Sequence, residues 1–517
     1  MGLAGRVFEL ASLDGVPVTD QAEKPAFTYV DLFAGIGGFA AALEAFGGHS
    51  VYSCEIDAAA ARVYERNWGH RALGDVTKVA NDDEVTVPEH DILAAGFPCQ
   101  PFSKSGAQRG MEETRGTLYW NILKIIEKHH PKIVLLENVR NLAGPRHKHE
   151  WDVIIKTLRE QGYRVSATPT VFSPHLLPLE RGGRPQVRER VFITATYDPD
   201  NLMDGQEPEP ALLNVSQRGG EEWNLIDDLP MDKRSDVPGT ALTDIEVAWI
   251  NAWDDFVTTM WPLVRESAGG GKATLPGFPL WADHWVTTDV LDHWRAGGSV
   301  PYRDAKAKGI PDSWDDIPGW KQTFLTKNAA FYTKYETVLG AWAARHGVFG
   351  DKFPASRRKF EWQAQQTETL WECVMQLRPS GIRAKRPTHL PALVAITQTS
   401  IVGPLRRRLS TEEAARLQGF PPNSFDFGKQ RDAATYKQLG NGVNIGAVWN
   451  VLGAHVDNDA PILRTSEEGR RILEAVLSAP ADPTDRVAEA LRSKRPPTLV
   501  DATTTGRVEV ELELVSA

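Results

Sequence analysis

The sequence contains very little cysteine. Its 517 residues include only Cys54, Cys99 and Cys373, which lie far apart and follow neither a paired nor a metal-ligand spacing. Disulfide scaffolds and zinc sites need several cysteines at short, regular spacings. We therefore expect reduced thiols, and neither a structural disulfide nor a bound metal.

Long apolar runs are absent as well. No stretch of about 18 apolar residues could cross a bilayer, and no N-terminal segment joins a basic flank to an apolar core and a cleavage site. With 41% hydrophobic and 24% charged residues, the chain has enough material for a sizeable core and enough length for two or three domains. These features predict a soluble, cytoplasmic protein without a membrane partner.

The net charge of −10 is distributed unevenly. Taken as a whole, an acidic balance weakly disfavours a nucleic-acid partner. Residues 378–408, however, carry seven basic residues and no Asp or Glu, whereas residues 201–256 carry 13 acids against three bases. A basic run can be an ordinary solvated face or a nucleic-acid surface, and its position relative to the motifs described below favours the second interpretation.

The first 200 residues alternate between strand and helix patterns. Short apolar runs bounded by turn residues predict strands, and longer amphipathic runs predict helices. Strands are expected at 27–33, 50–57, 90–97 and 132–139, and helices at 39–48, 58–68 and 117–131. This alternation predicts an α/β fold: a doubly wound, mostly parallel, Rossmann-like sheet with helices on both faces. Functional loops should then lie at the carboxyl ends of the strands.

The alternation of strand and helix patterns stops between residues 201 and 400. Tryptophan is frequent there, and 12 of the 16 tryptophans lie between 223 and 371. This change predicts a smaller inserted domain. The regular pattern resumes near 407–420, where Ser410 and Glu413 predict a capping box at the start of a helix. A helix near 466–477 and a strand at 507–515 are expected in the tail. The expected organisation is an N-terminal arm (1–25), a catalytic domain (26–200), the inserted domain (201–400), a return segment (401–457) and a C-terminal extension (458–517).

A glycine loop follows the first expected strand, in "DLFAGIGG" at 31–38. Glycines at a strand-to-helix turn let a ligand approach the backbone closely, and Glu55, at the end of the second strand, is placed to accept hydrogen bonds from a ribose. Asp75 in "GDV" follows an expected third strand and suits an adenine amino group. Such a loop fits a dinucleotide, S-adenosylmethionine, or no more than a tight turn, and the loop alone does not decide between them.

A thiol and a carboxyl group are expected at the same edge of the sheet. Cys99 lies in "GFPCQPFSKSG" (96–106), just past an apolar strand, and Glu137 ends the strand in "KIVLLENV". The carboxyl ends of parallel strands meet at one edge. A thiolate beside cationic groups is a good nucleophile, and Arg188 and Arg190 in "QVRER" are the local candidates for lowering its pKa. Glu137 suits either a functional acid or a salt-bridged structural one.

With these motifs in place, the sequence resembles the cytosine-5 DNA methyltransferases of the bacterial or phage modification type. The motifs appear in the family's order. They are "DLFAGIGGF", "GFPCQPFSKSG", "ENV", "QVRERVFI", "RRLSTEEAARLQGFP" and "YKQLGNGVNIGAV". One departure is Gly442 in "GNGV", where the family usually has serine.

The resemblance implies an enzyme that uses S-adenosylmethionine to methylate C5 of a cytosine flipped out of double-stranded DNA. Cys99 would add to C6 of the ring, Glu137 would hold or protonate N3, Arg190 would contact O2, and Arg188 would steady the loop and the nucleophile. The resemblance leaves open what removes the C5 proton, and ordered water is one candidate. Residues 100–118 have the composition of a mobile lid that closes on DNA.

The remaining site residues follow from the same resemblance. Pro98 and Ser103 join the catalytic group. The expected cofactor-binding residues are Phe33, Gly35, Gly37, Gly38, Glu55, Ile56, Asp75, Leu118, Asn441 and Val443. The expected DNA-binding residues are Gln100, Ser105, Arg115, Arg378, Arg383, Lys385 and Arg386. No metal ligand is expected.

Three rival functions fit parts of the sequence. An RNA cytosine methyltransferase would share the glycine loop and Cys99, but the large inserted domain and its basic stretch favour duplex DNA. A catalytically silent DNA-binding regulator would not need Cys99, Glu137, Arg188 and Arg190 together. A nicotinamide-dependent dehydrogenase has only the glycine loop in its favour. We therefore expect a monomeric modification enzyme, in a restriction-modification setting.

Overall fold

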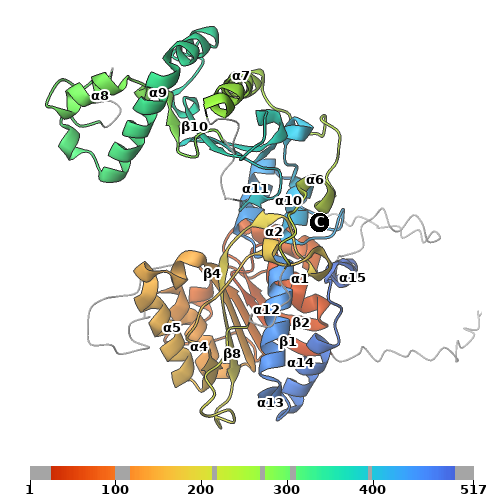
Figure 1. The fold of residues 1–517 in the computed structure, drawn as a ribbon. Helices are drawn as coiled ribbons and strands as arrows, with labels where there is room; N and C mark the ends of the chain where they lie inside the picture. Colours follow the sequence, from red (N-terminus) through yellow and green to blue (C-terminus); the bar gives the residue numbers. More distant parts are fainter. Residues whose placement is uncertain are drawn as a thin grey trace, which may run out of the picture.

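The computed structural model describes residues 25–98, 117–211, 218–267, 274–302, 310–393 and 399–494. Cys99, Gln100, Ser103, Ser105 and Arg115 lie outside these ranges, as does the strand expected at 507–515. Two larger sheets dominate the fold, and Figure 1 shows one above the other, with the C-terminal helices packed against the lower one. Within the described ranges, no helix combines the length and the apolar character needed to span a membrane.

The first sheet has seven strands, in the order β2-β1-β3-β4-β8-β5 with β6 also paired to β8. Its strands are β1 (Phe27–Leu32), β2 (Gly48–Cys54), β3 (Ile92–Gly96), β4 (Ile133–Val139), β5 (Tyr163–Val165), β6 (Thr170–Phe172) and β8 (Arg190–Tyr197). The pairs among β1 to β4 are parallel, and β8 is antiparallel to its three partners β4, β5 and β6. Six of the seven strands therefore run in one direction, as expected for a mostly parallel sheet, and the pairings with β8 make the sheet mixed.

Helices cover both faces of this sheet. In Figure 1, α4 (Leu118–His129) and α5 (Lys148–Glu160) lie on one side, and α1 (Gly38–Ala45) and α12 (Ile445–Asn458) lie on the other. Alternate β1 side chains enter two different cores: Tyr29 packs with α1 and α12, whereas Val30 packs with α4 and α5. Burial on both faces explains why these strands read as continuous apolar runs.

Local signals in the sequence set several helix limits. The Asp57 side chain accepts hydrogen bonds from the amides of Ala59 (2.9 Å) and Ala60 (3.2 Å), which starts α2 (Ala58–Trp68). The helix ends at Gly69, whose φ of 73° only glycine adopts readily. The predicted capping box of Ser410 and Glu413 is confirmed at the start of α10 (Thr411–Gln418).

One expected strand is wrong. Residues 70–75, before the "GDV" turn, form no strand, and Leu73 contributes a single backbone hydrogen bond to Ser53 of β2 (2.7 Å). Asp75 instead caps a short 3-10 helix at Val76–Lys78, where its carboxylate accepts from the Thr77 amide (3.0 Å). The apolar stretch before Gly74 is too short to form a ladder beside β2.

The second sheet has six strands, in the order β15-β14-β11-β12-β10-β9. They are β9 (Leu280–Trp281), β10 (Lys359–Gln363), β11 (Val374–Arg378), β12 (Gly381–Lys385), β14 (Ile401–Val402) and β15 (Arg407–Arg408). Its apolar face forms a core with α7 (Asp244–Ser267) and α9 (Gly319–Arg345), and α8 (Thr288–Arg295) belongs to a smaller cluster. The dense tryptophans supply much of these two cores, Trp253, Trp294 and Trp342 among them.

The limits of this second unit differ from those expected at 201 and 400. Leu225 and Leu229, around α6 (Leu225–Asp228), pack into the core of the first sheet, so the segment just after 201 belongs with the catalytic part. At the other end, β14 and β15 extend the second sheet to Arg408. Composition marked the tryptophan-rich core, but it could not show which flanking segments pack on which sheet.

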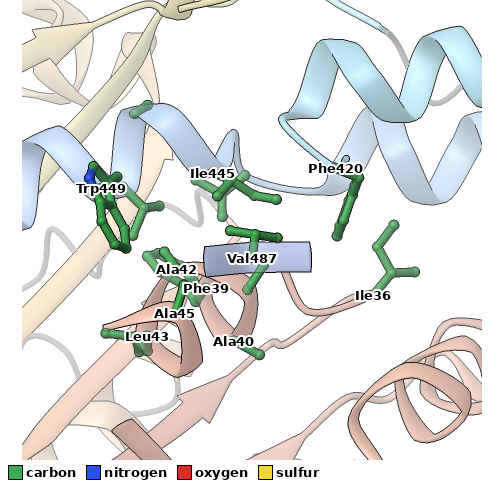
Figure 2. Close-up of a cluster of buried hydrophobic side chains, with 14 of the residues drawn as sticks. Ile36, Phe39, Ala40, Ala42, Leu43, Ala45, Phe420, Ile445, Trp449 and Val487 are labelled. Carbon is green, nitrogen blue, oxygen red and sulfur yellow. The ribbon is translucent and has the colours of Figure 1, made fainter. Parts of the chain in front are cut away.

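The C-terminal helices are part of the first core. α13 (Ala460–Leu463), α14 (Glu467–Leu477) and α15 (Thr484–Lys494) follow α12 directly, and α14 lies close to the helix expected at 466–477. Figure 2 shows Val487 of α15 among side chains of α1 and α12, below Ile445 and beside Phe39 and Ala42. Lys494 also forms an ion pair with the nearly buried Glu44 of α1 (3.0 Å).

We expect Leu491→Ala to destabilise the protein by about 2–5 kcal/mol, because it leaves a cavity between α15 and the core of the first sheet. Leu491 is buried, with 1% of its surface exposed. Urea denaturation would measure the change, and Arg492→Ala, at the exposed neighbouring position of the same helix, is the matched control. Equal stability of the two variants would contradict a structural role for α15.

Candidate active site

A cavity of about 460 Å³ opens at the carboxyl ends of β1 to β4. The segments that line it lie at or just after the ends of β1 (33–35), β2 (55–57), β3 (96–98) and β4 (137–139), together with the junction of α11 (Asp432–Asn441) and α12. This is the edge at which an open α/β sheet binds its ligands. The cavity volume is within the range of small-molecule sites.

Most of the expected cofactor-binding residues line this cavity. They are Phe33, Gly35, Gly38, Glu55, Ile56, Asp75, Leu118, Asn441 and Val443. Three of the expected catalytic residues, Pro98, Glu137 and Arg190, line it too. The cavity wall therefore reaches Pro98, the residue before Cys99.

Gly37 is an exception, because it serves the packing of the loop and does not line the cavity. Its φ is 93°, and a Cβ there would lie 2.0 Å from Nε1 of Trp68. That nitrogen donates a hydrogen bond to the Ile36 carbonyl (3.1 Å), which locks the loop against α2. Glycine is needed at this position for the backbone conformation and for the close approach of the indole.

Residues at the end of β2 form hydrogen bonds with the backbone of the glycine loop. The Glu55 carboxylate accepts hydrogen bonds from the amides of Gly35 (2.8 Å) and Asp57 (2.7 Å). Phe33, at the start of the loop, has a positive φ of 58°, which is unusual for a bulky residue. The Ala34 amide donates to the Cys54 carbonyl (2.9 Å). These contacts fix the loop in one shape before any ligand binds.

Glu137 and Arg190 form an ion pair inside the cavity, with Arg190 Nε 3.0 Å from Glu137 Oε1. Burial raises the pKa of Glu137, although Arg190 and Arg188 act in the opposite direction. The strand register brings the pair together, because Glu137 lies in β4 and Arg190 begins the antiparallel strand β8. A carboxyl group with a raised pKa and a cation beside it can hold or deliver a proton.

Arg188 does not line the cavity. Its guanidinium is buried, with 2% of the residue exposed, and it donates to the carbonyls of Leu393 (3.2 Å), Gly440 (2.8 Å) and Gly442 (2.6 Å). Gly440 and Gly442 themselves form part of the cavity wall. Among the described residues, Arg188 is therefore placed to position the cavity wall, rather than to contact a ligand.

Gly442 itself needs no special backbone conformation. Its φ is −66°, and a Cβ there would meet only the carbonyls of Gln438 (3.5 Å) and Leu439 (3.8 Å), at ordinary contact distances. The Gly442 carbonyl accepts from Arg188, and the amide donates to Gln438 (2.9 Å). The serine usual in the family could be accommodated here, and both backbone hydrogen bonds form with glycine.

Two polar contacts at the cavity were not expected from the sequence. Asp57 forms an ion pair with Lys437 of α11 (3.1 Å), which joins the end of β2 to the closing motif, and this hydrogen bond is the main reason that the pKa of Asp57 is lowered. The Asn138 side chain donates to the Phe97 carbonyl (2.9 Å), two residues before Cys99. The helix after Asp57 was expected from the sequence, but the partner of Asp57, 380 residues away, was not.

The expected DNA-binding residues of the second unit do not form one free basic patch. Arg378 and Arg383 both pair with Glu361, at 2.6 Å and 2.7 Å. Arg386 pairs with Glu222 at 2.5 Å. Two further residues of the basic run, Arg407 and Arg408, pair with Glu413 (2.7 Å) and Glu246 (2.5 Å). The basic run is therefore balanced by acids from other parts of the chain.

Comparison with known proteins identifies the family. C-5 cytosine-specific DNA methylase is the family that matches, over residues 27–456. The chain belongs to this family. "Type II methyltransferase M.AluI" of Cellulosimicrobium cellulans is 48% identical over 514 residues, which cover 89% of this chain and 97% of that protein. "Type II methyltransferase M.HhaI" of Haemophilus parahaemolyticus is 42% identical over 187 residues, or 36% of this chain and 54% of that protein.

Among solved structures, the crystal structure of S. pombe Dnmt2 methyltransferase matches with a TM-score of 0.37 and 16% identity, covering 84% of this chain and 99% of that one. The resemblance seen in the sequence motifs is thus confirmed by the family match and by the relative that spans nearly the whole chain. The protein is a DNA cytosine-5-methyltransferase. The dehydrogenase, the silent regulator and the RNA enzyme are set aside.

The raised pKa of Glu137 makes the stability of the methylase depend on pH. The ordinary value for this carboxyl is 4.5, and the folded state binds the proton more tightly than the unfolded chain does. Ionisation of Glu137 therefore costs stability as the pH rises from about 4.5 through the folded-state pKa. Glu137→Gln cannot ionise, so its melting temperature relative to wild type should rise across this window. A difference that stays flat from pH 4 to pH 7 would contradict the raised pKa.

Proposed function

We propose that this methylase transfers a methyl group from S-adenosylmethionine to C5 of a cytosine turned out of duplex DNA, by way of a covalent bond between Cys99 and C6. One observation carries the proposal. The constrained glycine loop and the Glu137–Arg190 pair share a single cavity, whose wall runs up to Pro98, the residue before Cys99. Because Cys99 directly follows Pro98, we propose that its thiol acts as the nucleophile at this edge of the sheet.

The cavity suits S-adenosylmethionine chemically. A Cβ at Gly35 would meet nothing within 4 Å, which leaves room for a ligand against the backbone. Each Glu55 oxygen has one backbone partner and retains a lone pair for a ribose hydroxyl. Asp75 provides an acceptor for an adenine amino group, and Phe33, Ile56 and Leu118 provide apolar surface around it. When bound, this cofactor supplies an electrophilic methyl group.

The protein's own side chains have to make C5 of cytosine nucleophilic. In the proposed sequence of steps, the Cys99 thiolate forms a bond to C6, and Glu137 holds or delivers a proton at N3, where negative charge develops. Arg190, already beside Glu137, donates to O2. C5 then takes the methyl group as its bond to the cofactor sulfur breaks. The C5 proton leaves to a base or to water, any proton delivered to N3 returns to Glu137, and the C6–S bond breaks to release the Cys99 thiolate.

Duplex DNA is the proposed substrate because a cytosine within a base stack cannot reach a cavity at the edge of the sheet, so the base must be flipped out. The second sheet, with the arginines of β11 and β12, supplies the proposed target-recognition surface. We also propose that the methylase acts in a restriction-modification system, because its relatives include Type II methyltransferases. A monomer is the oligomeric state that we propose for it.

The covalent step can be trapped. Duplex DNA that carries 5-fluorocytosine at the target should form a complex that survives denaturation, because fluorine blocks the loss of the C5 substituent. Cys99→Ala should abolish this complex and all methylation detected by bisulfite sequencing, while DNA binding persists. Cys373→Ala, a change in the buried core of the second unit, is the matched control and should keep both activities. Trapping by the Cys99→Ala variant would refute the assigned nucleophile.

Glu55→Ala should weaken the binding of S-adenosylmethionine about 10- to 150-fold. Removal of the carboxylate takes away a charged hydrogen-bond acceptor worth about 1.5–3 kcal/mol and frees the Gly35 amide. Isothermal titration calorimetry would measure the affinity, with Glu65→Ala on the exposed side of α2 as the control. NADH should show no saturable binding. Unchanged affinity in Glu55→Ala would place the ribose elsewhere.

A further inference from the structure

The second sheet has one polar face and one apolar face. Phe360, Leu377 and Ile382, from β10, β11 and β12, point into the tryptophan-rich core. Side chains alternate across a strand, so the residues between these point the other way. The opposite face carries Lys359, Glu361, Gln363, Gln376, Arg378, Arg383 and Lys385, none of which is buried.

This polar face is turned toward the catalytic part of the molecule. Val374 lies on the same face of β11 as Gln376, and it is the register partner of Val402 in β14. Both valines are buried in the core of the first sheet, with Phe420 and Leu405. In Figure 1, α10 and α11 lie between the two sheets. At Val374, this face of the sheet therefore contacts the core of the first sheet. Further along β11, the same face carries the polar side chains of Gln376 and Arg378.

Glu361 is the only acid on this face of β10, β11 and β12. It lies beside Arg383 in the strand register. Its Oε2 accepts from Arg383 Nε (2.8 Å) and lies 2.7 Å from Arg383 Nη2 in the ion pair, while its Oε1 accepts from Arg378 Nη2 (2.6 Å). The carboxylate is 17% exposed, and the two arginines are 25% and 29% exposed. The guanidinium groups are thus fixed in place and still reach solvent.

The geometry leaves a particular set of donors available. Because the carboxylate lies on the Nε and Nη2 side of the Arg383 guanidinium, the opposite end of the group keeps an Nη1 hydrogen and an Nη2 hydrogen in the same plane. Two parallel donors of this kind match O6 and N7 of guanine in the major groove. The two glutamines of the face add side-chain amides, which can pair with base edges.

The polar face carries an excess of positive charge. Lys359 and Lys385 join Arg378 and Arg383, so four cations stand against the one carboxylate of Glu361 on this face of β10, β11 and β12. Burial and the two neighbouring arginines lower the pKa of Lys385. Four cations gathered on one face are stabilised when an electron-rich partner covers them. Arg386 stands apart from this group, because it follows β12 and pairs with Glu222.

We propose that Glu361 is a positioning residue for sequence recognition: it holds Arg383 and Arg378 in the orientation that reads base edges of duplex DNA. This role rests on the proposed function of the second sheet as the surface that recognises DNA. It gives a negatively charged side chain, Glu361, a part in binding negatively charged DNA. Glu361 contributes to specificity and opposes affinity, because its charge repels phosphates while its hydrogen bonds orient the two guanidinium groups.

The test compares Glu361→Gln with wild type on duplexes whose methylated site has first been mapped by bisulfite sequencing. The measured quantity is the ratio of kcat/KM for that site to kcat/KM for each single-base-pair change. At one position this ratio should fall about ten- to a hundredfold, the range for one lost bidentate arginine contact. Binding to a duplex without the site should become tighter, since a negative charge is removed. An unchanged ratio at every position would overturn the proposal.

Glu368→Gln is the matched control. It removes the same charge and breaks an arginine pair in the same unit, Arg265–Glu368 at 2.7 Å, away from the polar face. Its ratios should equal those of wild type. A similar loss of specificity in this control would show a general charge effect, and would also overturn the proposal.

Arg383→Ala keeps the proposal testable if Glu361→Gln does not fold. It should lose discrimination at the same base pair, and the double variant should be no worse there than Arg383→Ala alone, because the two residues act as a unit. Additive losses would contradict the positioning role. If wild type methylates no site at all, the proposed function fails. If wild type is specific and Glu361→Gln is equally specific, only the role of Glu361 fails.

Discussion

The buried guanidinium of Arg188 joins the three parts of the chain from which the active site is built. It extends from the strand pair of β7 (Gln186–Val187) and β13 (Leu390–Pro391) to the carbonyls of Leu393, Gly440 and Gly442. These partners lie 205 to 254 residues further along the chain. Burying an arginine is costly unless its donors are satisfied; here backbone carbonyls accept from Nη1 and Nη2, whereas the buried Nε has no hydrogen-bond partner among the described residues. Loss of this side chain would leave three carbonyls without their donor, at the wall of the cavity.

A second buried arginine connects the two sheets. Arg407 of β15 donates to both oxygens of Glu413 in α10 (2.9 Å and 2.7 Å), and also to the carbonyls of Asp232 and Arg234. Glu413 accepts the Ser410 amide as part of the capping box as well (2.9 Å). One carboxylate therefore starts a helix of the catalytic part and anchors an edge strand of the second sheet. The orientation of the polar face relative to the cavity depends on this pair.

The sequence predicted the features that arise from local patterns. Burial on both faces made the strands of the first sheet visible, and the residues after Asp57 and Ser410 marked two helix starts. Nearly all expected cofactor-binding residues line one cavity, because parallel strands bring their carboxyl ends to one edge. Long-range pairing was not predictable. Arg407 belongs to a run that suggests a basic surface, yet it is buried, and Arg188 was expected beside the nucleophile. Arg188 bonds to carbonyls more than 200 residues away, and Arg407 is enclosed by Glu413 nearby and by the distant carbonyls of Asp232 and Arg234.

The arginines of this methylase are largely paired with its own acids in the absence of DNA. Glu137 pairs with Arg190, Glu361 with Arg378 and Arg383, and Glu222 with Arg386. An arginine whose carboxylate stays in place attracts phosphates weakly, so it displaces few counterions from DNA and adds little affinity that is independent of sequence. The donors that the carboxylate leaves free bind only an acceptor of matching geometry. If the second sheet reads DNA as proposed, internal pairing therefore lets an acidic protein discriminate among sequences on a polyanion.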